Sequence, residues 1–293
     1  MKASIRMNKK TIQIYYRLTK PGIIRGNAIT TTGGFLLASK GQFDIWLFVA
    51  TLVGISAVIA SACVVNNYID RSIDAKMKRT KKRALVTGAI SVQSAIVFAL
   101  ALGISGVVAL SFTNLLTTVL AIMGFVFYVL FYGIAKRKTV HGTLVGSVSG
   151  AIPIVVGYCA VSQTFDIGAW LLFFVMVFWQ MPHFYAIALY RLEDYRAAHI
   201  PVLPLRYSIQ TTKLQILLYI VGFVLATYTM TLFDYTGYIY LFVMAIMGVW
   251  WLYIAIRGFG TDDYARWARG VFSFSLKVLL VFSIMISLEA WLP

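Results

Sequence analysis

The sequence predicts an all-α integral membrane protein, built as a bundle of nine transmembrane helices. Of its 293 residues, 60% are hydrophobic and only 12% are charged, whereas soluble domains carry about 25% charged residues. The mean hydropathy is +0.82. The apolar residues gather in continuous runs of about 20, the length that a helix needs to cross a bilayer. These runs lack the alternation of a membrane β-barrel, so helices are the structure that lipid allows here.

The chain begins with a polar, basic and aromatic stretch, residues 1–20, which we expect to form a cytoplasmic arm along the membrane interface. The apolar runs that follow predict nine spans. No linker, low-complexity segment or soluble domain is recognised, so residues 1–293 are expected to form a single membrane domain. The expected spans are 21–39, 45–69, 90–111, 115–135, 141–161, 168–190, 212–232, 236–257 and 270–290.

The basic residues set the orientation of the bundle. With the N-terminus in the cytoplasm, 24 of the 26 Lys and Arg residues fall in or beside cytoplasmic segments. This is the pattern of the positive-inside rule. The net charge of +16 is therefore expected to reflect topology, with the lipid bilayer and not nucleic acid as the partner. The C-terminus then lies on the outer side, and the chemistry faces the cytoplasm.

The most informative stretch is NNYIDRSIDAKMKRTKKR, residues 66–83, directly after the second span. Asn66, Asp70 and Asp74 recur every four residues, so a helix places their side chains on one side over about two turns. Two carboxylates and an amide oxygen suit a hard cation such as Mg²⁺. Carboxylates at a membrane edge are costly unless partnered, which favours a functional site. The three residues are thus candidate catalytic and metal-binding groups.

Seven basic residues follow within thirteen positions, from Arg71 to Arg83. Basic residues beside a span often only set topology. Next to a predicted cation site they could also hold the phosphates that such a cation bridges.

A second polar cluster lies in WQMPHFYAIALYRLEDYRAAHIPVLP, residues 179–204. His183, Tyr190 and Asp194 lie near one helical face, which could converge with the face of Asn66. Two such patches would bind two cations and one diphosphate, and Glu193 would be the other acid. For His183, a core histidine bonded to a carbonyl and an iron ligand or base both remain open. The two acids could also be solvated loop residues.

A third cluster, KRKTVHGTLVGSVSG, occupies residues 136–150. Lys136 and Arg137 end the fourth span and could serve either topology or phosphate binding. The small residues that follow are expected to let membrane helices pack closely.

Together these motifs resemble the UbiA superfamily of intramembrane prenyltransferases, and within it the gammaproteobacterial protohaem IX farnesyltransferases (haem O synthases). The match covers essentially the whole chain and includes TKPGIIRGN, NNYIDRSIDAKMKRTKKRALVTG, KRKTVHGTLVGSVSG, WQMPHFYAIALYRLEDY and HIPVLP. Quinone-type members tend to carry acids where this chain has His183 and Tyr190, which makes the second metal patch leaner here.

The resemblance implies a nine-helix bundle around a central cavity with a cytoplasmic cap, in the bacterial inner membrane with a periplasmic C-terminus. It implies a Mg²⁺-dependent farnesyl transferase whose substrates are farnesyl diphosphate and haem b. The metal ligands would be Asn66, Asp70, Asp74, Asp194 and Glu193, and His183 would be catalytic. The diphosphate would be bound by Arg79, Lys82, Arg83, Lys136, Arg137 and Lys20. Terminal-oxidase subunits or other haem-pathway proteins are the partners that the resemblance suggests, and no motif for them is recognised.

Three alternatives compete with this interpretation. Another enzyme of the same superfamily would act on a quinone precursor or a chlorin. A transporter would use Asp70, His183 and Asp194 as an ion path, although matched broken helices are not evident. A structural membrane subunit would leave the spacing of the acids unexplained.

Overall fold

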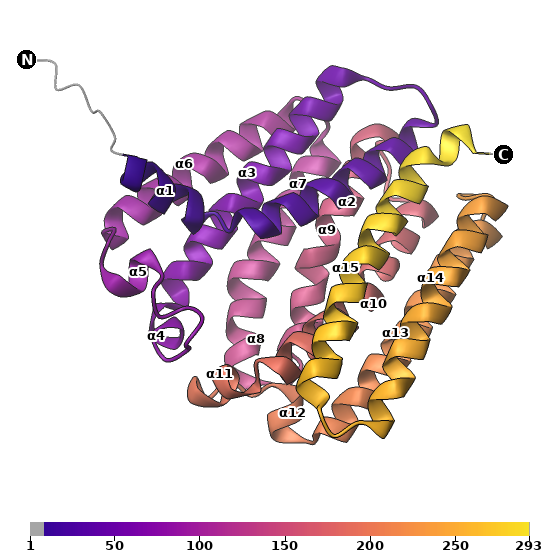
Figure 1. The fold of residues 1–293 in the computed structure, drawn as a ribbon. Helices are drawn as coiled ribbons and strands as arrows, with labels where there is room; N and C mark the ends of the chain where they lie inside the picture. The colour runs from indigo at the N-terminus through magenta and orange to yellow at the C-terminus, as the bar shows by residue number, and fades with distance from the viewer. Residues whose placement is uncertain (1–8, 293) are drawn as a thin grey trace, which may run out of the picture.

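The computed structural model describes residues 9–292, and every regular element in that range is a helix (Figure 1). Nine of these helices are long, and they correspond to the nine expected spans. They are α2 (Pro21–Ser39), α3 (Ile45–Ile69), α6 (Val92–Ser111), α7 (Leu115–Val126) continued by η1 (Phe127–Phe131) and α8 (Tyr132–Lys138), α9 (Gly142–Ser162), α10 (Ile167–Tyr190), α13 (Ile209–Leu232), α14 (Tyr238–Ile256) and α15 (Tyr264–Leu288).

Eight of the nine long helices in the described chain are apolar and long enough to cross a membrane. The exception, α2, carries three consecutive threonines and four glycines. Two of those threonines, Thr30 and Thr31, are buried, and the Thr31 hydroxyl donates a hydrogen bond to the Pro153 carbonyl of α9. The lower hydropathy of α2 thus reflects a helix that packs against protein over much of its surface.

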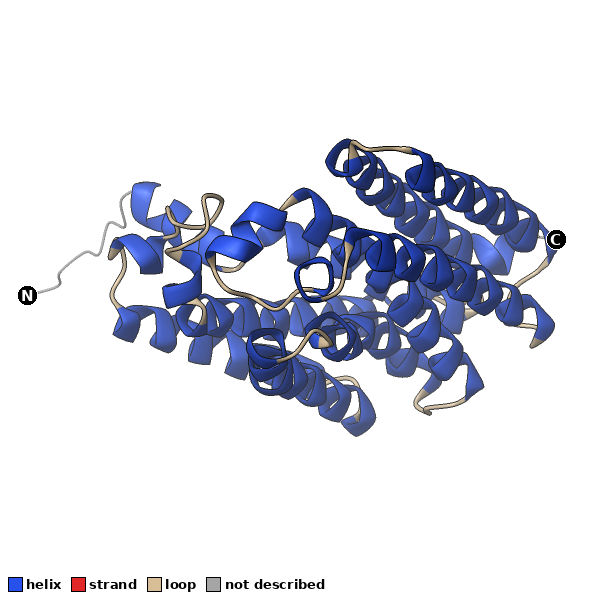
Figure 2. Cartoon of the chain, turned by 90° about the horizontal axis from the view of Figure 1, so that it is seen from below, coloured by secondary structure: helices blue, strands red, loops and turns tan. Residues whose placement is uncertain are grey.

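The long helices form a layered bundle in which α2, α9 and α10 occupy the middle (Figures 1 and 2). Helix α3 packs on α6 at one end, and α13 packs on α14 at the other. Between these ends, α2 contacts both α9 and α15, and α10 contacts α9, α13 and α15. Most of the buried apolar side chains belong to one continuous core, which extends from this middle layer to the helices on both sides.

Helices α2 and α9 approach each other closely through small residues. A Cβ on Gly157 would lie 2.1 Å from the Thr31 carbonyl oxygen, and one on Gly34 would lie 2.2 Å from that of Ile154. Earlier in α9, a Cβ on Gly150 would lie 1.9 Å from the side chain of Gln180 in α10. Small residues therefore bring α9 against its neighbours, as expected for membrane helices.

Short helices occur in the connections that hold the predicted motifs. Helices α4 (Arg71–Asp74) and α5 (Ala84–Thr87) follow α3, and α11 (Leu192–Ala197) and α12 (Leu203–Arg206) follow α10. In Figure 1, α4, α11 and α12 lie at the same lower edge of the bundle. Of the arm expected at residues 1–20, the described part forms helix α1 (Lys9–Leu18), and residues 1–8 lie outside the described range.

Candidate active site

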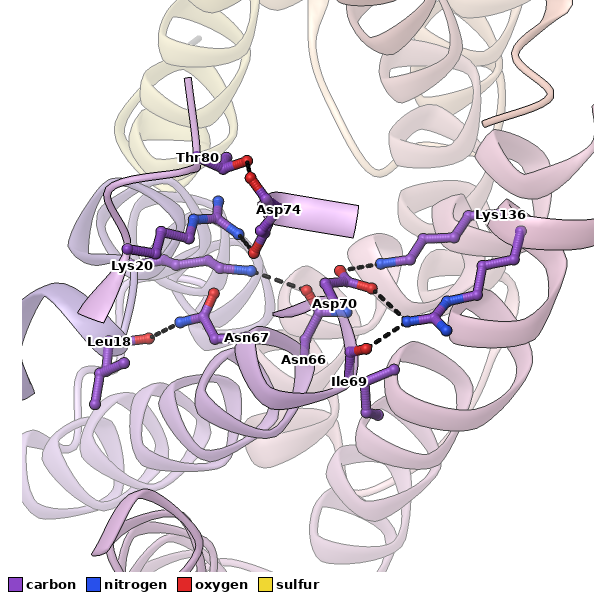
Figure 3. A network of polar contacts seen from close by, with 11 residues as sticks. Leu18, Lys20, Asn66, Asn67, Ile69, Asp70, Asp74, Thr80 and Lys136 are labelled. Carbon is purple, nitrogen blue, oxygen red and sulfur yellow. Dashed lines mark hydrogen bonds and ion pairs between the residues drawn. The ribbon is translucent and has the colours of Figure 1, made fainter. Parts of the chain in front are cut away.

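The side chains of Asn66, Asp70 and Asp74 extend to the same side, as their spacing predicted (Figure 3). Asn66 lies in the last turn of α3, Asp70 directly follows that helix, and Asp74 ends α4. Helix α3 ends at Ile69, and Asp70 takes the bridge conformation, with φ −85° and ψ 0°. The backbone still follows a helical path, because the Asp70 amide donates to the Asn66 carbonyl (2.9 Å) and the Asp74 amide donates to the Asp70 carbonyl (2.8 Å). All three residues are buried, with 3% to 7% of their surface exposed.

Asp70 is held between the two basic residues that end α8. The Lys136 ammonium donates to one carboxylate oxygen, and the Arg137 guanidinium lies 3.2 Å from the other. Arg137 also donates to the Ile69 carbonyl at the end of α3. The turn from α8 to α9 is tight enough that a Cβ on Gly142 would lie 2.6 Å from the Lys136 Cα atom. Lys136 and Arg137 thus contact an acid, which topology alone does not require.

Asp74 is paired with Arg83, whose guanidinium lies 2.5 Å from a carboxylate oxygen. The Thr80 hydroxyl donates to the Asp74 carbonyl at 2.9 Å. These two bonds fold the basic loop back on the acid that precedes it, so that Arg83 reaches the site from nine positions away.

Lys20 approaches the same place from the start of α2, where its ammonium donates to the Asn66 amide oxygen at 2.9 Å (Figure 3). Burial lowers the pKa of Lys20 to about 8, because an ammonium removed from water loses hydration that an amide oxygen replaces only in part. The neighbouring Asn67 fixes this approach by donating to the Leu18 carbonyl of α1 at 2.9 Å. A bound anion would compensate this buried charge.

The cluster thus brings together four basic side chains and only two carboxylates. The basic residues are Lys20, Arg83, Lys136 and Arg137. This excess of positive charge in a largely buried place suits a multiply charged anion such as a diphosphate.

The second motif contributes one buried acid. One Asp194 carboxylate oxygen accepts a hydrogen bond from the Lys78 backbone amide at 2.9 Å, and this bond joins α11 to the loop after α4. The predicted convergence of the two motifs is therefore seen at Asp194. Glu193 is not brought to the other acids: its side chain is 74% exposed and pairs with Arg196 on the same helix. Adjacent residues on a helix diverge by about 100°, so they do not share a face.

Two other predicted phosphate-binding residues, Arg79 and Lys82, are exposed on the loop after α4. Arg79 lies near Tyr195 of α11, where burial raises the pKa of the phenol and the Arg79 charge opposes that shift. Neither basic residue forms an ion pair within the described chain. Both are thus free to turn toward a ligand that enters beside the loop.

His183 points elsewhere, toward α15. Its Nδ1 atom lies 2.8 Å from the Ser275 hydroxyl, and its ring packs against Trp179 and Phe272, with centroids 4.8 Å away in each case. Tyr190 contacts the same Phe272 ring at 5.6 Å. His183 and Tyr190 therefore share a face, as predicted. That face meets aromatic side chains of α15, and only Asp194 of the predicted face contacts the loop after α3.

Sequence reasoning missed an aromatic ladder beside Asp70. Tyr128 stacks on Tyr132 at 5.5 Å, and the Lys136 ammonium lies 5.1 Å from the centre of the Tyr132 ring. The ladder includes part of the π-helical segment Phe127–Phe131, a feature that occurs often at functional sites. The four-residue spacing of Tyr128, Tyr132 and Lys136 was the signal that would have found it.

Without a bound phosphate, the protein oxygens of the cluster supply only part of the coordination that a hard cation needs. Within residues 9–292, no three His, Cys, Asp or Glu side chains lie together in a ready-made metal site. Asp70 and Asp74 supply two carboxylates, and Asn66 adds an amide oxygen, which are ligands that Mg²⁺ accepts together with phosphate oxygens. The Asn66 Nδ2 atom is enclosed without a hydrogen-bond partner, so this side chain is not fully satisfied by the protein.

Comparison with known proteins shows what this chain is similar to. The model of the UbiA prenyltransferase family matches residues 27–277. The chain is 53% identical over 279 residues to the protoheme IX farnesyltransferase of Protochlamydia amoebophila, covering 95% of this chain and 99% of that protein. It is 53% identical over 281 residues to the protein of the same name in Salmonella typhimurium, covering 95% of each.

Solved structures show the same fold at low sequence identity. A structure described for digeranylgeranylglyceryl phosphate synthase aligns with a TM-score of 0.78 at 19% identity, over 95% of this chain and 98% of that one. The UbiA homolog from Archaeoglobus fulgidus bound to GPP and Mg²⁺ aligns with a TM-score of 0.69 at 13% identity, over 91% and 99% of the two chains.

Proposed function

The chain belongs to the UbiA prenyltransferase family, and from this premise we propose that it transfers the farnesyl group of farnesyl diphosphate to a vinyl group of haem b. Water adds in the same reaction, which makes haem O. The similarity to protoheme IX farnesyltransferases along nearly the full length of both chains supports this choice of substrates. The structural observation that carries the proposal is Asp70, a buried carboxylate held between Lys136 and Arg137.

The basic side chains of the cluster bind the diphosphate. Lys136, Arg137 and Arg83 leave their carboxylate partners for phosphate oxygens, and Lys20 gains the anion that its buried ammonium lacks. Hydrogen bonds from charged donors are stronger than neutral ones. They strengthen further as charge develops on the leaving diphosphate, which lowers the barrier to breaking the allylic C–O bond. Arg79 and Lys82 would add to this binding from the exposed part of the loop.

Asn66, Asp70 and Asp74 would hold Mg²⁺ once their basic partners have turned to the phosphates. The ion, when bound, would act as a Lewis acid on the departing oxygens. Asp194 would supply a further oxygen while it keeps the Lys78 amide in place. The structure of a homolog bound to GPP and Mg²⁺ supports a role for the metal, because that protein has the same fold. Glu193 is exposed on α11 and pairs with Arg196, so it is not one of these proposed metal ligands.

The reaction follows from the release of diphosphate. The C–O bond of farnesyl diphosphate breaks, and the farnesyl carbon is attacked by the terminal carbon of a haem vinyl group. The cation left beside the macrocycle is captured by water, which loses a proton to give a hydroxyethylfarnesyl group. The Tyr128–Tyr132 ladder lies next to the cations that bind the leaving group. Its ring faces would interact favourably with positive charge there.

The site faces the cytoplasm of a bacterial inner membrane in this proposal. The connections that contain α4, α5, α11 and α12 carry a large share of the Lys and Arg residues, which the positive-inside rule assigns to the cytoplasm. Nine spans then place the C-terminus in the periplasm. Farnesyl diphosphate would reach its cationic site from the aqueous side with its chain in the bilayer.

The purified protein in detergent would be incubated with haem b, farnesyl diphosphate and Mg²⁺, with and without EDTA. Mass spectrometry should show a haem species heavier by one farnesyl group plus water, formed only when the metal is present. Diphosphate release that requires an aromatic acid in place of haem would contradict the proposed acceptor and favour a quinone-type enzyme. No turnover with any acceptor would contradict the proposal and return a transporter to consideration.

A further inference from the structure

Ser275 of α15 is fully buried and holds two side chains of α10. The Trp179 indole donates to the Ser275 carbonyl at 2.8 Å, and the His183 Nδ1 atom lies 2.8 Å from the Ser275 hydroxyl. Neither contact takes part in the chemistry described above. Together they fix the plane and the direction of the His183 ring.

The hydroxyl proton of Ser275 is already used. Its Oγ atom donates to the Phe272 carbonyl at 2.6 Å, and a serine hydroxyl has one proton to donate. Toward His183 this oxygen can therefore only accept. The hydrogen of the contact must belong to Nδ1 of the imidazole, so the hydrogen-bond network assigns the tautomer.

The ring is best accommodated without charge. Rings of Trp179, Phe184 and Phe272 surround it, and no carboxylate in residues 9–292 pairs with it. A lone charge in such surroundings within a membrane is costly. A neutral imidazole carries one proton, and here that proton is on Nδ1. Nε2 therefore presents a free lone pair.

The Nε2 atom of His183 is neither paired nor fully enclosed. The residue keeps 8% of its surface exposed. Nε2 accepts no hydrogen bond from the described chain, and it is not among the enclosed polar atoms that lack a partner. Its lone pair is thus available to a ligand.

We propose that Ser275 is a positioning residue that holds the His183 ring with Nδ1 protonated, so that Nε2 ligates the iron of the haem acceptor. Neutral imidazole nitrogen is a common iron ligand. Histidines that bind metals almost always donate their other N–H to a fixed acceptor. Here the Ser275 hydroxyl is that acceptor. This inference rests on the proposed function, because it assumes a metalloporphyrin substrate.

The test compares two porphyrins in the absence of farnesyl diphosphate. Affinities of the full-length protein in detergent would be measured for haem b and for metal-free protoporphyrin IX, together with the absorption and EPR spectra of bound ferric haem. His183→Ala should remove the preference for haem, and Ser275→Ala should reduce it by about 10-fold or more, as for other partners of metal ligands. Ser275→Thr, which keeps a hydroxyl, should restore the wild-type spectrum.

Two controls separate ligation from folding. Metal-free protoporphyrin IX should bind equally well to all variants, because it has no iron to ligate. Ser283→Ala removes another buried hydroxyl of α15, one that has no hydrogen-bond partner, and should leave haem binding unchanged. Equal losses for both porphyrins, or a wild-type haem spectrum in Ser275→Ala, would overturn the assignment of Ser275. A wild-type spectrum in His183→Ala would overturn iron ligation, while farnesyl transfer to haem would still stand.

Discussion

The connections after α3 and after α10 are alike in plan and different in content. Each follows a long helix, contains two short helices and carries two acids. After α3, Asp70 and Asp74 are both buried, and each is paired with basic side chains. After α10, Asp194 is buried against a backbone amide and Glu193 is exposed. The comparison suggests that the first connection holds the reacting groups and that the second mainly supports it.

The largest effect is expected for Asp70→Asn. The variant keeps the shape of the side chain but removes the charge that faces Lys136 and Arg137. We expect kcat/KM for farnesyl transfer to fall by about 10²- to 10³-fold, measured by mass spectrometry of the haem product. Asp262→Asn, which changes an exposed acid before α15, should keep full activity. Full activity of Asp70→Asn in folded protein would remove the metal role of this residue.

A smaller effect is expected for Lys136→Met. Loss of one charged donor to phosphate should raise KM for farnesyl diphosphate by about 10- to 100-fold, with a smaller effect on haem binding. Lys138→Met is the matched control, because Lys138 lies two positions away at the same helix end and is exposed. Similar KM values for the two variants would indicate that Lys136 serves topology alone.

Asp194 tests the contrast between the two connections most directly. Asp194→Asn keeps an oxygen for the Lys78 amide, whereas Asp194→Ala removes it. We expect activity to fall on the order of 10-fold in the Asn variant and the thermal midpoint to fall only in the Ala variant, where a backbone donor loses its partner. An Asn variant with wild-type kcat/KM would restrict Asp194 to supporting the loop.

The smallest effect is expected for Glu193→Gln. The side chain is exposed and its ion pair with Arg196 is on the surface, where such pairs contribute about 1 kcal/mol or less. Activity and the thermal midpoint should both stay at wild-type values in the same two assays. A loss comparable to that of Asp70→Asn would mean that Glu193 turns inward in the working enzyme, and the contrast would no longer hold.

Much of the fold could be predicted, because lipid leaves few choices. The span expected at 45–69 matches α3, and the one expected at 212–232 lies within α13. The last span was expected at 270–290, but α15 begins at Tyr264. Its first two turns carry Arg266 and Arg269, which lower the local hydropathy without interrupting the helix.

From the residue pattern, the candidate site was predictable only where the spacing of nearby residues determines which side chains share a face. The common face of Asn66, Asp70 and Asp74 follows from a four-residue repeat within one stretch of chain. Arg83 comes from the loop that follows, but Lys20, Lys136 and Arg137 come from other helices, so tertiary packing chooses them. The same limit applies to Ser275, which lies 92 positions from His183. For Glu193 and Asp194, the sequence shows two adjacent acids and nothing that indicates which one is buried.

The π-helical segment Phe127–Phe131 has a consequence for how this chain tolerates insertions and deletions. A π-turn holds one residue more than an α-turn, so α7 reaches α8 with its register shifted. Deleting one residue in this segment would restore a regular α-helix and leave the helix after it in nearly the same orientation, because the π-turn already absorbs the extra residue. Lys136 and Arg137 would then stay beside Asp70, whereas a deletion in the α-helical part of α7 would rotate them away by about 100°. A one-residue gap at this place in an alignment is therefore compatible with the same site.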